Sequence, residues 1–369
     1  MARPGRVDMS KQDGSAGMAE VIIDRIGSAG VIRLNRPRAL NSLNLGMVRI
    51  IVEALDGFAE DPAIASVIVT GEGDRGLCAG GDIRAIHDSA KAGTSDAFDF
   101  WREEFRLNEA ISRYPQPYVV LMDGITMGGG VGLSAHGSHR IVTERTRLAM
   151  PETGIGYFPD VGATWLLARA PGETGTWLGL TGNTIGAADV IYAGLADYMV
   201  PAERLPELKT AIGALPPDAD AAAVSAAIAA VSQPVGVSVL ETERPLIDRC
   251  FAFDTVEEIL DALDNYGSSF ASETAATIRS RSPTSLKLTL RLLREAANSA
   301  SLAECLEREF SACQRILDKP DFFEGVRAAV IDKDRNPKWN PARLADVSGA
   351  DLDSFFTADH APLFQHHRV

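Results

Sequence analysis

PYVVLMDGITMGGGVGLSAHG, residues 117–137, joins a buried-strand pattern to a cluster of glycines. The apolar run 117–124 has the length and composition of a strand that is buried on both faces. Gly128-Gly129-Gly130 follow it and lead into a short helical segment of small residues. The same order recurs upstream, where the apolar run SVIVT (66–70) precedes CAGGDI (78–83). Each glycine cluster therefore marks a strand-to-helix junction, as α/β architecture requires.

The elements on either side fit the same architecture. Residues 19–35 predict a β-hairpin, Asn44 predicts the N-cap of a helix, and a helix (95–113) and a strand (139–144) follow farther along. After about residue 200 only helical patterns follow, at 201–215, 220–231, 255–265, 269–280, 284–297 and 301–318. We therefore expect an α/β protein with three regions, which are a flexible N-terminus (1–18), an α/β core (19–200) and a helical C-terminal region (201–369).

Composition and charge exclude several classes of protein. The chain has 369 residues, of which 46% are hydrophobic and 23% charged, as is ordinary for a globular protein. Its formal net charge of -14 argues against nucleic acid as a partner, because phosphate backbones are bound by clustered Lys and Arg. No apolar run reaches the length of a membrane span. The N-terminus lacks the apolar centre of a secretion signal, and Asp8, Asp13 and Glu20 fit a mitochondrial transit peptide poorly. We expect a cytoplasmic protein, and leave open whether it forms a homo-oligomer.

Cysteine and histidine give no sign of a metal site. The six His residues form no HxxxH pair, and the cysteines form no CxxC pair. The four cysteines are Cys78, Cys250, Cys305 and Cys313. We expect these cysteines to be reduced and structural, and we expect no metal.

The glycine clusters have two interpretations. At a strand-to-helix junction, unpaired N–H groups and the helix dipole face the same point. Two such junctions that converge would form an oxyanion hole, suited to a thioester carbonyl. Close packing of two backbones, where only glycine fits, explains the same pattern. GEGDRG (71–76) also matches GxGxxG, but LCAGGD after it opens no amphipathic helix, so a dinucleotide site is disfavoured.

Three segments together resemble a known family. VIRLNRPRALNSLN (31–44), CAGGDI (78–83) and DGITMGGGVGLSAHG (123–137) are similar, in order and spacing, to the signature segments of the enoyl-CoA hydratase/isomerase, or crotonase, superfamily. The resemblance implies a spiral of ββα units, an acyl-CoA substrate and no separate cofactor. It also implies an oxyanion hole made by the amides of Gly81 and Gly129. The residues that match the part of the family holding CoA are Arg38, Ala39, Leu40, Ala79, Asp82 and Ile83. For Arg38, an exposed turn residue is the alternative.

The resemblance breaks at one position. The family's hydratases carry one glutamate at the position matching Gly132 and another at the position matching Glu152. Hydration of a double bond uses two carboxylates around one water, and a glycine cannot move protons, so hydratase activity is in doubt. We expect Gly132 to lie in the wall of the site and to leave space for the acyl group and a hydrolytic water.

Two acids follow in MPETGIGYFPDVG (150–162). Glu152 and Asp160 lie among Gly, Pro and apolar residues, which is unlike a solvated charged face. Partly buried carboxyl groups with raised pKa values suit acid–base chemistry near neutral pH. Helix capping is the alternative, above all for Asp160 before VGATWLLARA (161–170).

The same segment resembles the 3-hydroxyisobutyryl-CoA hydrolases, the thioester-cleaving branch of the superfamily. WREEFRLNEAI (101–111) and IDKDRNPKWNP (331–341) agree with that branch, so the resemblance covers nearly the whole chain. It implies hydrolysis of a 3-hydroxyacyl-CoA, as in valine catabolism. Glu152 would attack the thioester or activate water, Asp160 would hold the 3-hydroxyl or assist proton transfer, and Glu104 would line the substrate pocket.

Alternatives remain for both the residue and the activity. Helical spacing alone favours a surface position for Glu104, beside Arg102 and Arg106. An enoyl-CoA hydratase or isomerase that works with Glu152 alone is the second interpretation of the activity. A non-catalytic acyl-CoA-binding protein on the same fold is the third, because fold does not determine function.

Overall fold

The structure is a computed structural model, and it describes residues 19–357 and 360–364. The segment 1–18, for which the sequence predicts flexibility, lies outside the described residues. Strands and helices alternate as far as Met199, and the later elements of the described chain are helical, which confirms the predicted class. Within these residues, no helix is long and apolar enough to cross a membrane.

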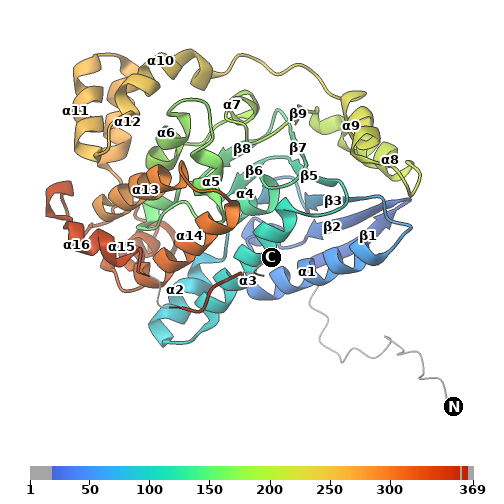
Figure 1. The fold of residues 1–369 in the computed structure, drawn as a ribbon, viewed down its shortest axis with the longest axis horizontal. Coiled ribbons are helices and arrows are strands. Elements are labelled where there is room, and N and C mark those ends of the chain that lie inside the picture. Colours follow the sequence, from blue (N-terminus) through green and yellow to red (C-terminus); the bar gives the residue numbers. More distant parts are fainter. Residues whose placement is uncertain (1–18, 358–359, 365–369) are drawn as a thin grey trace.

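The described chain contains a six-stranded sheet, which lies in the right-hand half of Figure 1. In spatial order its strands are β1 (Val21–Ile26), β2 (Ala29–Leu34), β3 (Ser66–Gly71), β5 (Tyr118–Met122), β7 (His139–Val142) and β9 (Tyr198–Met199). β1 and β2 form the predicted hairpin and pair antiparallel. The other neighbours run parallel, and parallel pairs need crossover connections, which the intervening helices supply.

A second, smaller sheet continues from the ends of the large one. It is parallel and contains β4 (Gly76–Cys78), β6 (Ile125–Met127) and β8 (Arg147–Ala149). Each of these strands follows a strand of the large sheet along the chain, so the backbone makes repeated strand–strand–helix turns. This is the ββα spiral that the resemblance implies. The sequence patterns did not predict these short strands, and the glycine clusters therefore follow β4 and β6 rather than the long strands.

Short helices and three longer ones connect the strands. They are α1 (Leu45–Glu60), α2 (Ile83–Ala92), α3 (Asp96–Ser112), α4 (Gly129–Ser134), α5 (Ala163–Leu167), α6 (Thr174–Thr181) and α7 (Ala187–Tyr192). Asn44 caps α1 as predicted, because its side chain accepts the N–H of Met47 at 2.9 Å.

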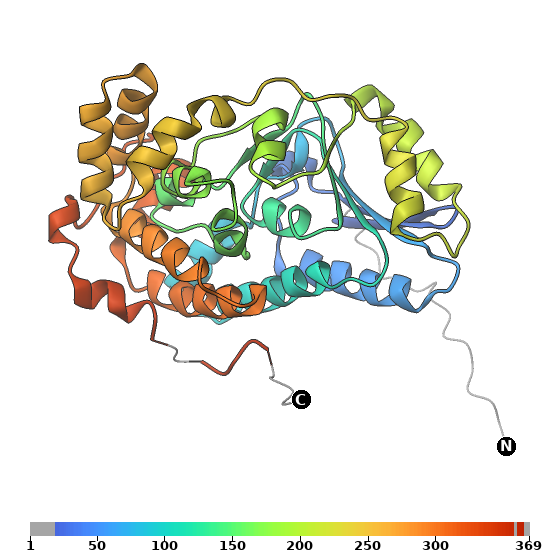
Figure 2. The same cartoon turned by 45° about the horizontal axis from the view of Figure 1, so that its top comes forward.

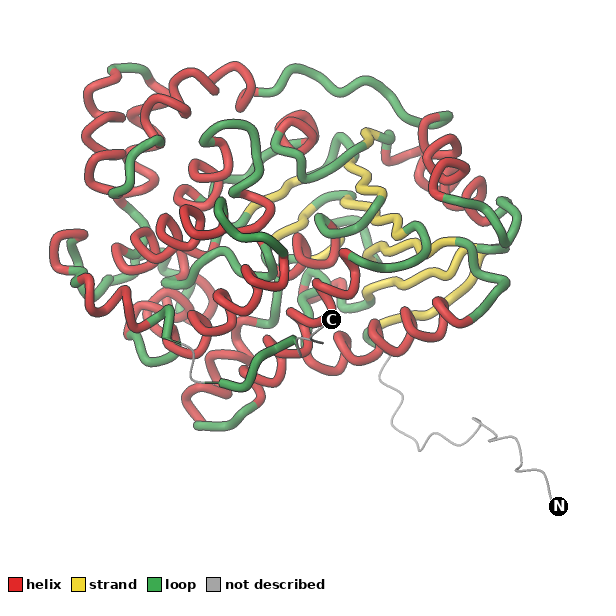
Figure 3. Tube along the Cα trace, viewed as in Figure 1, coloured by secondary structure: helices red, strands yellow, loops and turns green. Residues whose placement is uncertain are grey.

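After β9 the described chain is helical (Figure 3). The α-helices there are α8 (Leu205–Gly213), α9 (Ala221–Ala229), α10 (Val239–Phe251), α11 (Val256–Tyr266), α12 (Ser269–Arg279), α13 (Pro283–Ala296), α14 (Leu302–Ile316), α15 (Pro320–Val326) and α16 (Gly349–Ser354). The sequence patterns did not predict α10, which contains Pro245, a residue that disfavours helix interiors. α3 packs between α1 and α14, and Figure 2 shows the three along one edge of the molecule.

Both faces of the large sheet are buried. Ile68 and Val119 pack with Leu208 of α8, so α8 and α9 cover one face. Val67 and Val120, whose side chains point the opposite way, belong to a larger core on the other face. That core contains residues from both sides of position 200. Burial on two faces explains why the strands are continuous apolar runs instead of alternating patterns.

Candidate active site

A small cavity of about 80 Å³ lies where the two glycine loops meet the chain after β8. Its lining residues are Ala79, Gly80, Gly81, Ile83, Ile86, Phe100, Trp101, Glu104, Gly128, Gly129, Pro151, Glu152, Ile155, Tyr157, Asp160 and Val161. Most of the site residues expected from the sequence therefore meet at one place. The residues outside the lining are Arg38, Ala39, Leu40 and Asp82.

The two glycine loops bring the amides of Gly81 and Gly129 side by side. A Cβ atom added at Gly129 would lie 3.3 Å from the nitrogen of Gly81. Gly129 is the first residue of α4, so its N–H has no partner within the helix. The bridge between Leu43 and Gly81 uses the carbonyl of Gly80 and the N–H of Asp82, so the Gly81 N–H takes no part in it. Two adjacent N–H groups without backbone partners are what an oxyanion hole needs.

The loop before α1 lies directly against the first glycine cluster. Ala79 donates its N–H to the carbonyl of Leu40 at 3.0 Å. Leu40 and Asn41 have φ angles of 53° and 57°, a left-handed conformation that turns the loop back toward β4. Arg38 and Ala39 are exposed at the tip, and the Arg38 side chain forms no ion pair with a described residue. This loop is outside the cavity and borders it.

Asp82 has a structural role. Its carboxylate accepts the N–H of Ala85 at 3.3 Å as the N-cap of α2, and it pairs with Arg36 at 3.1 Å. Arg36 in turn donates to the carbonyl of Ser42 at 2.7 Å. The carboxylate of Asp82 therefore ties the loop 36–43 to α2 rather than facing the cavity.

Two carboxyl groups lie directly over the glycines of the second cluster. Oε1 of Glu104 is 2.5 Å from the position that a Cβ would take at Gly129. Oε1 of Glu152 is 3.0 Å from the corresponding position at Gly128. A side chain at either glycine would therefore displace a carboxyl group. Oε1 of Glu104 and Oε2 of Glu152 are buried and have no hydrogen-bond partner among the described residues. Buried polar atoms normally have a partner, so these two atoms mark where a ligand or water would bind.

Glu104 is not on the surface of α3. It is 2% exposed and shares the buried face of the helix with Trp101, Phe105 and Asn108. The surface position that helical spacing alone favoured for Glu104 is therefore wrong. Arg102 and Arg106 lie on other faces of the same helix. A charged residue at the spacing of an apolar face is the pattern that identifies such a position.

Asp160 is held by a buried tyrosine. The Tyr157 hydroxyl donates to Oδ2 of Asp160 at 3.0 Å and lies 2.9 Å from Sγ of Cys313. Because the hydroxyl has one proton, the thiol of Cys313 donates to the phenol oxygen. Tyr157 lies within the motif 150–162, but no sequence argument assigned it a role.

Burial raises the pKa values of the three carboxyl groups in the cavity. Desolvation raises the pKa of Asp160 to about 7, against the Tyr157 hydrogen bond, which lowers it. Desolvation, followed by the negative charge of Asp160, raises the pKa of Glu152 and that of Glu104 well above their ordinary values. The cavity can therefore hold protonated and ionised carboxyl groups together near neutral pH.

A fourth buried carboxyl group, Glu309 on α14, fixes the backbone behind Asp160. Its oxygens accept the N–H of Gly162 at 2.7 Å and the N–H of Thr164 at 3.2 Å. It thereby caps α5, whose own N-cap residue is Gly162 and has no side chain. The alternative interpretation, in which the Asp160 side chain only caps this helix, is therefore wrong. No sequence pattern assigned a role to Glu309, although it falls on the apolar face of α14 beside Phe310.

The four cysteines are buried and form no disulfide, which agrees with the expectation of reduced, structural residues. Cys78 lies next to the glycine loop, where a nucleophile would be conceivable. Burial raises the pKa of its thiol to about 12, so the thiol stays protonated and unreactive at neutral pH.

Gly132 does not leave open space in the cavity wall, so that expectation is wrong. A Cβ at this position would lie 2.8 Å from Nδ2 of Asn108 and 2.8 Å from Cβ of Val161. Val161 lines the cavity and Gly132 lies behind it. The space that a hydratase-type glutamate would need at position 132 is therefore filled by two buried side chains.

Substitution of Gly132 should destabilise the protein. We expect Gly132→Ala to cost about 1–3 kcal/mol of unfolding free energy, as overpacking of a core usually does, and Gly132→Glu to cost more. Gly57→Ala is the matched control, because Gly57 is exposed in α1 with open space around it and should be neutral or slightly stabilising. Denaturant unfolding of the three variants measures this. A Gly132→Glu protein as stable as the wild type would contradict the packing argument.

Comparison with known proteins identifies the family. The sequence profile of the enoyl-CoA hydratase/isomerase family matches residues 29–356. The mitochondrial 3-hydroxyisobutyryl-CoA hydrolase of Xenopus tropicalis is 46% identical over 346 residues, which cover 92% of this chain and 89% of that protein. The enzyme of the same name from Homo sapiens is 44% identical over 352 residues, which cover 94% and 90%.

Two solved structures have the same fold but are named for reactions other than thioester hydrolysis. A carnitinyl-CoA dehydratase from Mycobacterium thermoresistibile superposes with a TM-score of 0.89 at 44% identity, covering 94% of this chain and 99% of that one. An enoyl-CoA hydratase from Rhodobacter sphaeroides 2.4.1 superposes with a TM-score of 0.83 at 41% identity, covering 92% and 97%. The chain thus belongs to the enoyl-CoA hydratase/isomerase family, the crotonase superfamily, and is similar over most of its length to that family's 3-hydroxyisobutyryl-CoA hydrolases.

Proposed function

We propose that this protein hydrolyses 3-hydroxyisobutyryl-CoA to 3-hydroxyisobutyrate and free CoA, the reaction of valine breakdown. Water supplies the hydroxyl that becomes part of the new carboxyl group, and its remaining proton ends on the thiol of CoA. The observation that carries the proposal is a pair of buried carboxyl oxygens, one from Glu104 and one from Glu152, beside the two glycine amides. Neither oxygen has a hydrogen-bond partner in the part of the chain that the structure describes. The identity of 44–46% with proteins named for this reaction supports it.

The glycine amides would bind the thioester carbonyl. As a nucleophile adds to the carbonyl carbon, negative charge develops on the oxygen, and the N–H groups of Gly81 and Gly129 would stabilise it. One such donor contributes about 2.7–4 kcal/mol to the transition state. The CoA moiety would lie outside the cavity, in contact with Arg38, Ala39 and Leu40. Ala79, Asp82 and Ile83 would lie beside the same moiety.

Glu152 would start the reaction in one of two ways. Its carboxylate either attacks the thioester, forming an acyl–enzyme anhydride that water then opens, or takes a proton from the attacking water. A carboxylate with a raised pKa is a stronger base than an ordinary one, which suits the second route near neutral pH. In both routes the carbon–sulfur bond breaks as the carbonyl re-forms, and the thiolate takes up a proton.

Asp160 would recognise the substrate's 3-hydroxyl or assist proton transfer, with Glu104 beside it. With a pKa of about 7, Asp160 can accept a hydrogen bond when ionised and donate one when protonated. The small size of the cavity, about 80 Å³, favours a short, branched acyl group over a long chain.

The pH dependence should reflect the charge of Asp160. Activity needs Glu152 as a carboxylate, so the rate should rise with pH through the pKa of Glu152. Since the charge of Asp160 is one cause of that raised pKa, Asp160→Asn should move the acidic limb of the kcat/KM profile to lower pH. Desolvation remains, so the limb should stay above the range of an exposed glutamate. An acidic limb that does not move would show that the charge of Asp160 does not influence the pKa of Glu152.

An enoyl-CoA hydratase or dehydratase is the second candidate, because two solved relatives carry those names. The cavity does contain more than one carboxyl group, which such a reaction requires. The packing of Asn108 and Val161 against Gly132 argues against it, since the position of the hydratase glutamate is closed. The cytoplasm remains the compartment that we expect from the sequence, although the relatives named above are mitochondrial.

Thiol release from purified protein tests the proposal. We expect one free CoA and one 3-hydroxyisobutyrate for each molecule of 3-hydroxyisobutyryl-CoA, at a rate proportional to enzyme concentration. Binding of the substrate without release of thiol above the uncatalysed rate would contradict the proposal and favour a non-catalytic acyl-CoA-binding protein.

A further inference from the structure

A second cleft, of about 580 Å³, lies beside the catalytic cavity. It shares Pro151 and Ile155 with that cavity, so the short turn Glu152–Ile155 separates the two spaces. Its lining residues are Pro151, Gly154, Ile155, Arg279, Ser280, Arg281, Ala328, Ala329, Arg335, Asn336, Pro337 and Trp339. No role in the proposed hydrolysis uses this cleft.

The charge of this cleft is opposite to that of the chain. The whole protein carries a formal charge of -14, yet three arginines and no acidic residue line the cleft. Arg279 is paired with Asp264 at 2.5 Å. Arg281 and Arg335 form no ion pair with any residue in the described part of the chain. Two arginines without an acidic partner in the described chain therefore line one cleft.

Arg281 is held in place although no acid compensates its charge. Its Nε and Nη2 donate to the carbonyl of Thr181 at 2.9 and 2.5 Å, and the residue is partly buried. That desolvation lowers the pKa of the guanidinium. A Cβ at Gly154 would lie 3.0 Å from its Nη1, so the glycine leaves this nitrogen uncovered. A desolvated cation without a counterion is unfavourable, and binding of an anion would compensate it.

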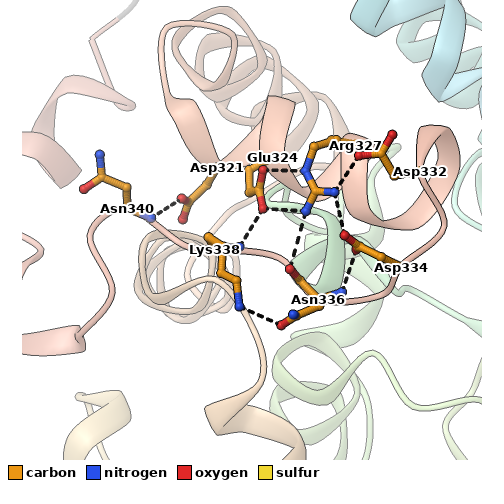
Figure 4. Close-up of polar contacts among 8 residues, drawn as sticks. All are labelled: Asp321, Glu324, Arg327, Asp332, Asp334, Asn336, Lys338 and Asn340. Carbon is orange, nitrogen blue, oxygen red and sulfur yellow. Dashed lines mark hydrogen bonds and ion pairs between the residues drawn. The ribbon is translucent and has the colours of Figure 1, made fainter.

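The loop that carries Arg335 is organised by a different arginine (Figure 4). Arg327 pairs with Glu324 at 2.8 Å and with Asp332 and Asp334 at 2.7 Å each. Glu324 also accepts the N–H of Lys338 at 2.7 Å. The nearby acids are thus engaged with Arg327 and with the loop backbone, as Figure 4 shows. Arg335 is exposed and has no acidic partner among the described residues. This network holds the segment IDKDRNPKWNP (331–341), which the sequence analysis singled out without a role.

Two further features belong to a built site. Arg335 has a φ angle of 53°, a left-handed backbone conformation that residues with side chains rarely adopt. Trp339 donates its indole N–H to the carbonyl of Ser280 at 3.0 Å, which fixes an aromatic ring in the wall of the cleft. A rigid ring beside two unpaired guanidinium groups suits an organic anion.

We propose that this cleft is a second binding site, for an organic ligand with a carboxylate or phosphate group that pairs with Arg281 and Arg335. Guanidinium groups bind both kinds of oxyanion with two parallel hydrogen bonds. Two sources follow from the chemistry of the proposed function. One is the carboxylate product released on the other side of the turn Glu152–Ile155, and the other is a phosphate of the nucleotide part of CoA. The site itself rests on the charges and the cleft, and only the choice of these probes rests on the proposed function.

Isothermal titration of the full chain tests the site. The probes are inorganic phosphate, 3-hydroxyisobutyrate and adenosine 3′,5′-bisphosphate. We expect the affinity of at least one probe to fall by about tenfold or more in Arg335→Ala, the range for a lost hydrogen bond to a charged group. Arg281→Gln should lower it further. Arg343→Ala is the matched control, because Arg343 is an exposed arginine of the same C-terminal segment that pairs with Asp346 outside the cleft.

The outcomes separate the sources and the alternatives. If 3-hydroxyisobutyrate binds most tightly, the ligand is the product carboxylate. If adenosine 3′,5′-bisphosphate binds most tightly, the ligand is the nucleotide part of CoA. No binding of any probe, or affinities that Arg335→Ala and Arg281→Gln leave unchanged, would overturn the proposal. The Arg335 side chain forms no hydrogen bond or ion pair with the described residues, so its variant stays informative even if Arg281→Gln unfolds. Because the readout is binding to the resting protein, a protein without hydrolase activity would still give the expected result with phosphate or bisphosphate.

Discussion

Glu152→Gln is expected to lower the rate of thiol release by at least about 10²-fold. Glutamine keeps the shape of the side chain and removes its ability to attack or to take a proton. The loss should appear in kcat and kcat/KM alike, because the interaction belongs to the transition state. Steady-state kinetics on 3-hydroxyisobutyryl-CoA measure it.

The fold of this variant should not suffer. A carboxyl group whose pKa is raised in the folded chain stabilises the fold below its unfolded pKa and loses that contribution as the pH rises. Glu152→Gln should therefore melt at the same temperature as the wild type or higher at neutral pH. Glu53→Gln, an exposed residue of α1, is the control and should leave both rate and stability unchanged. Turnover of Glu152→Gln within a few-fold of the wild type would exclude Glu152 from the mechanism.

The 3-hydroxyl of the substrate should control the rate almost as strongly. We expect 3-hydroxyisobutyryl-CoA to be cleaved at least about 10²-fold faster than isobutyryl-CoA, because a site built to bind a hydroxyl leaves buried polar groups unpaired when the hydroxyl is missing. Asp160 and Glu104 supply those groups in the cavity, and Oε1 of Glu104 has no hydrogen-bond partner within residues 19–357 and 360–364.

Asp160→Asn should shrink this preference, mainly by slowing the hydroxylated substrate. The ratio of the two kcat/KM values in wild type and variant is the quantity to compare, since it cancels general losses of activity. Equal rates on the two thioesters in the wild-type protein would contradict the role assigned to Asp160.

Sequence patterns predicted the features that depend on local chemistry. Long apolar runs predicted β3 and β5, and the cap at Asn44 predicted the start of α1. The glycine clusters and the motif 150–162 identified the segments that meet in the cavity. These features follow from neighbouring residues, which a single sequence contains.

The features that the sequence did not predict correctly depend on contacts between distant residues. β4, β6 and β8 are three residues long, too short for a periodic pattern, and their pairing with one another creates the second sheet. Glu309 caps a helix that begins more than a hundred residues earlier in the chain. Gly132 was assigned to the cavity wall, but only the packing of Asn108 and Val161 determines which side of the wall it occupies.

The central claim is that this cavity cleaves a thioester and does not hydrate a double bond. The most direct test uses two parallel assays on one preparation of the wild-type protein. One assay measures thiol release from 3-hydroxyisobutyryl-CoA, and the other measures loss of enoyl absorbance with crotonyl-CoA. We expect rapid thiol release that Glu152→Gln abolishes. Hydration of crotonyl-CoA should be at least about 10²-fold slower, because position 132 supplies no second carboxylate. Rapid hydration of crotonyl-CoA without release of thiol from 3-hydroxyisobutyryl-CoA would contradict it.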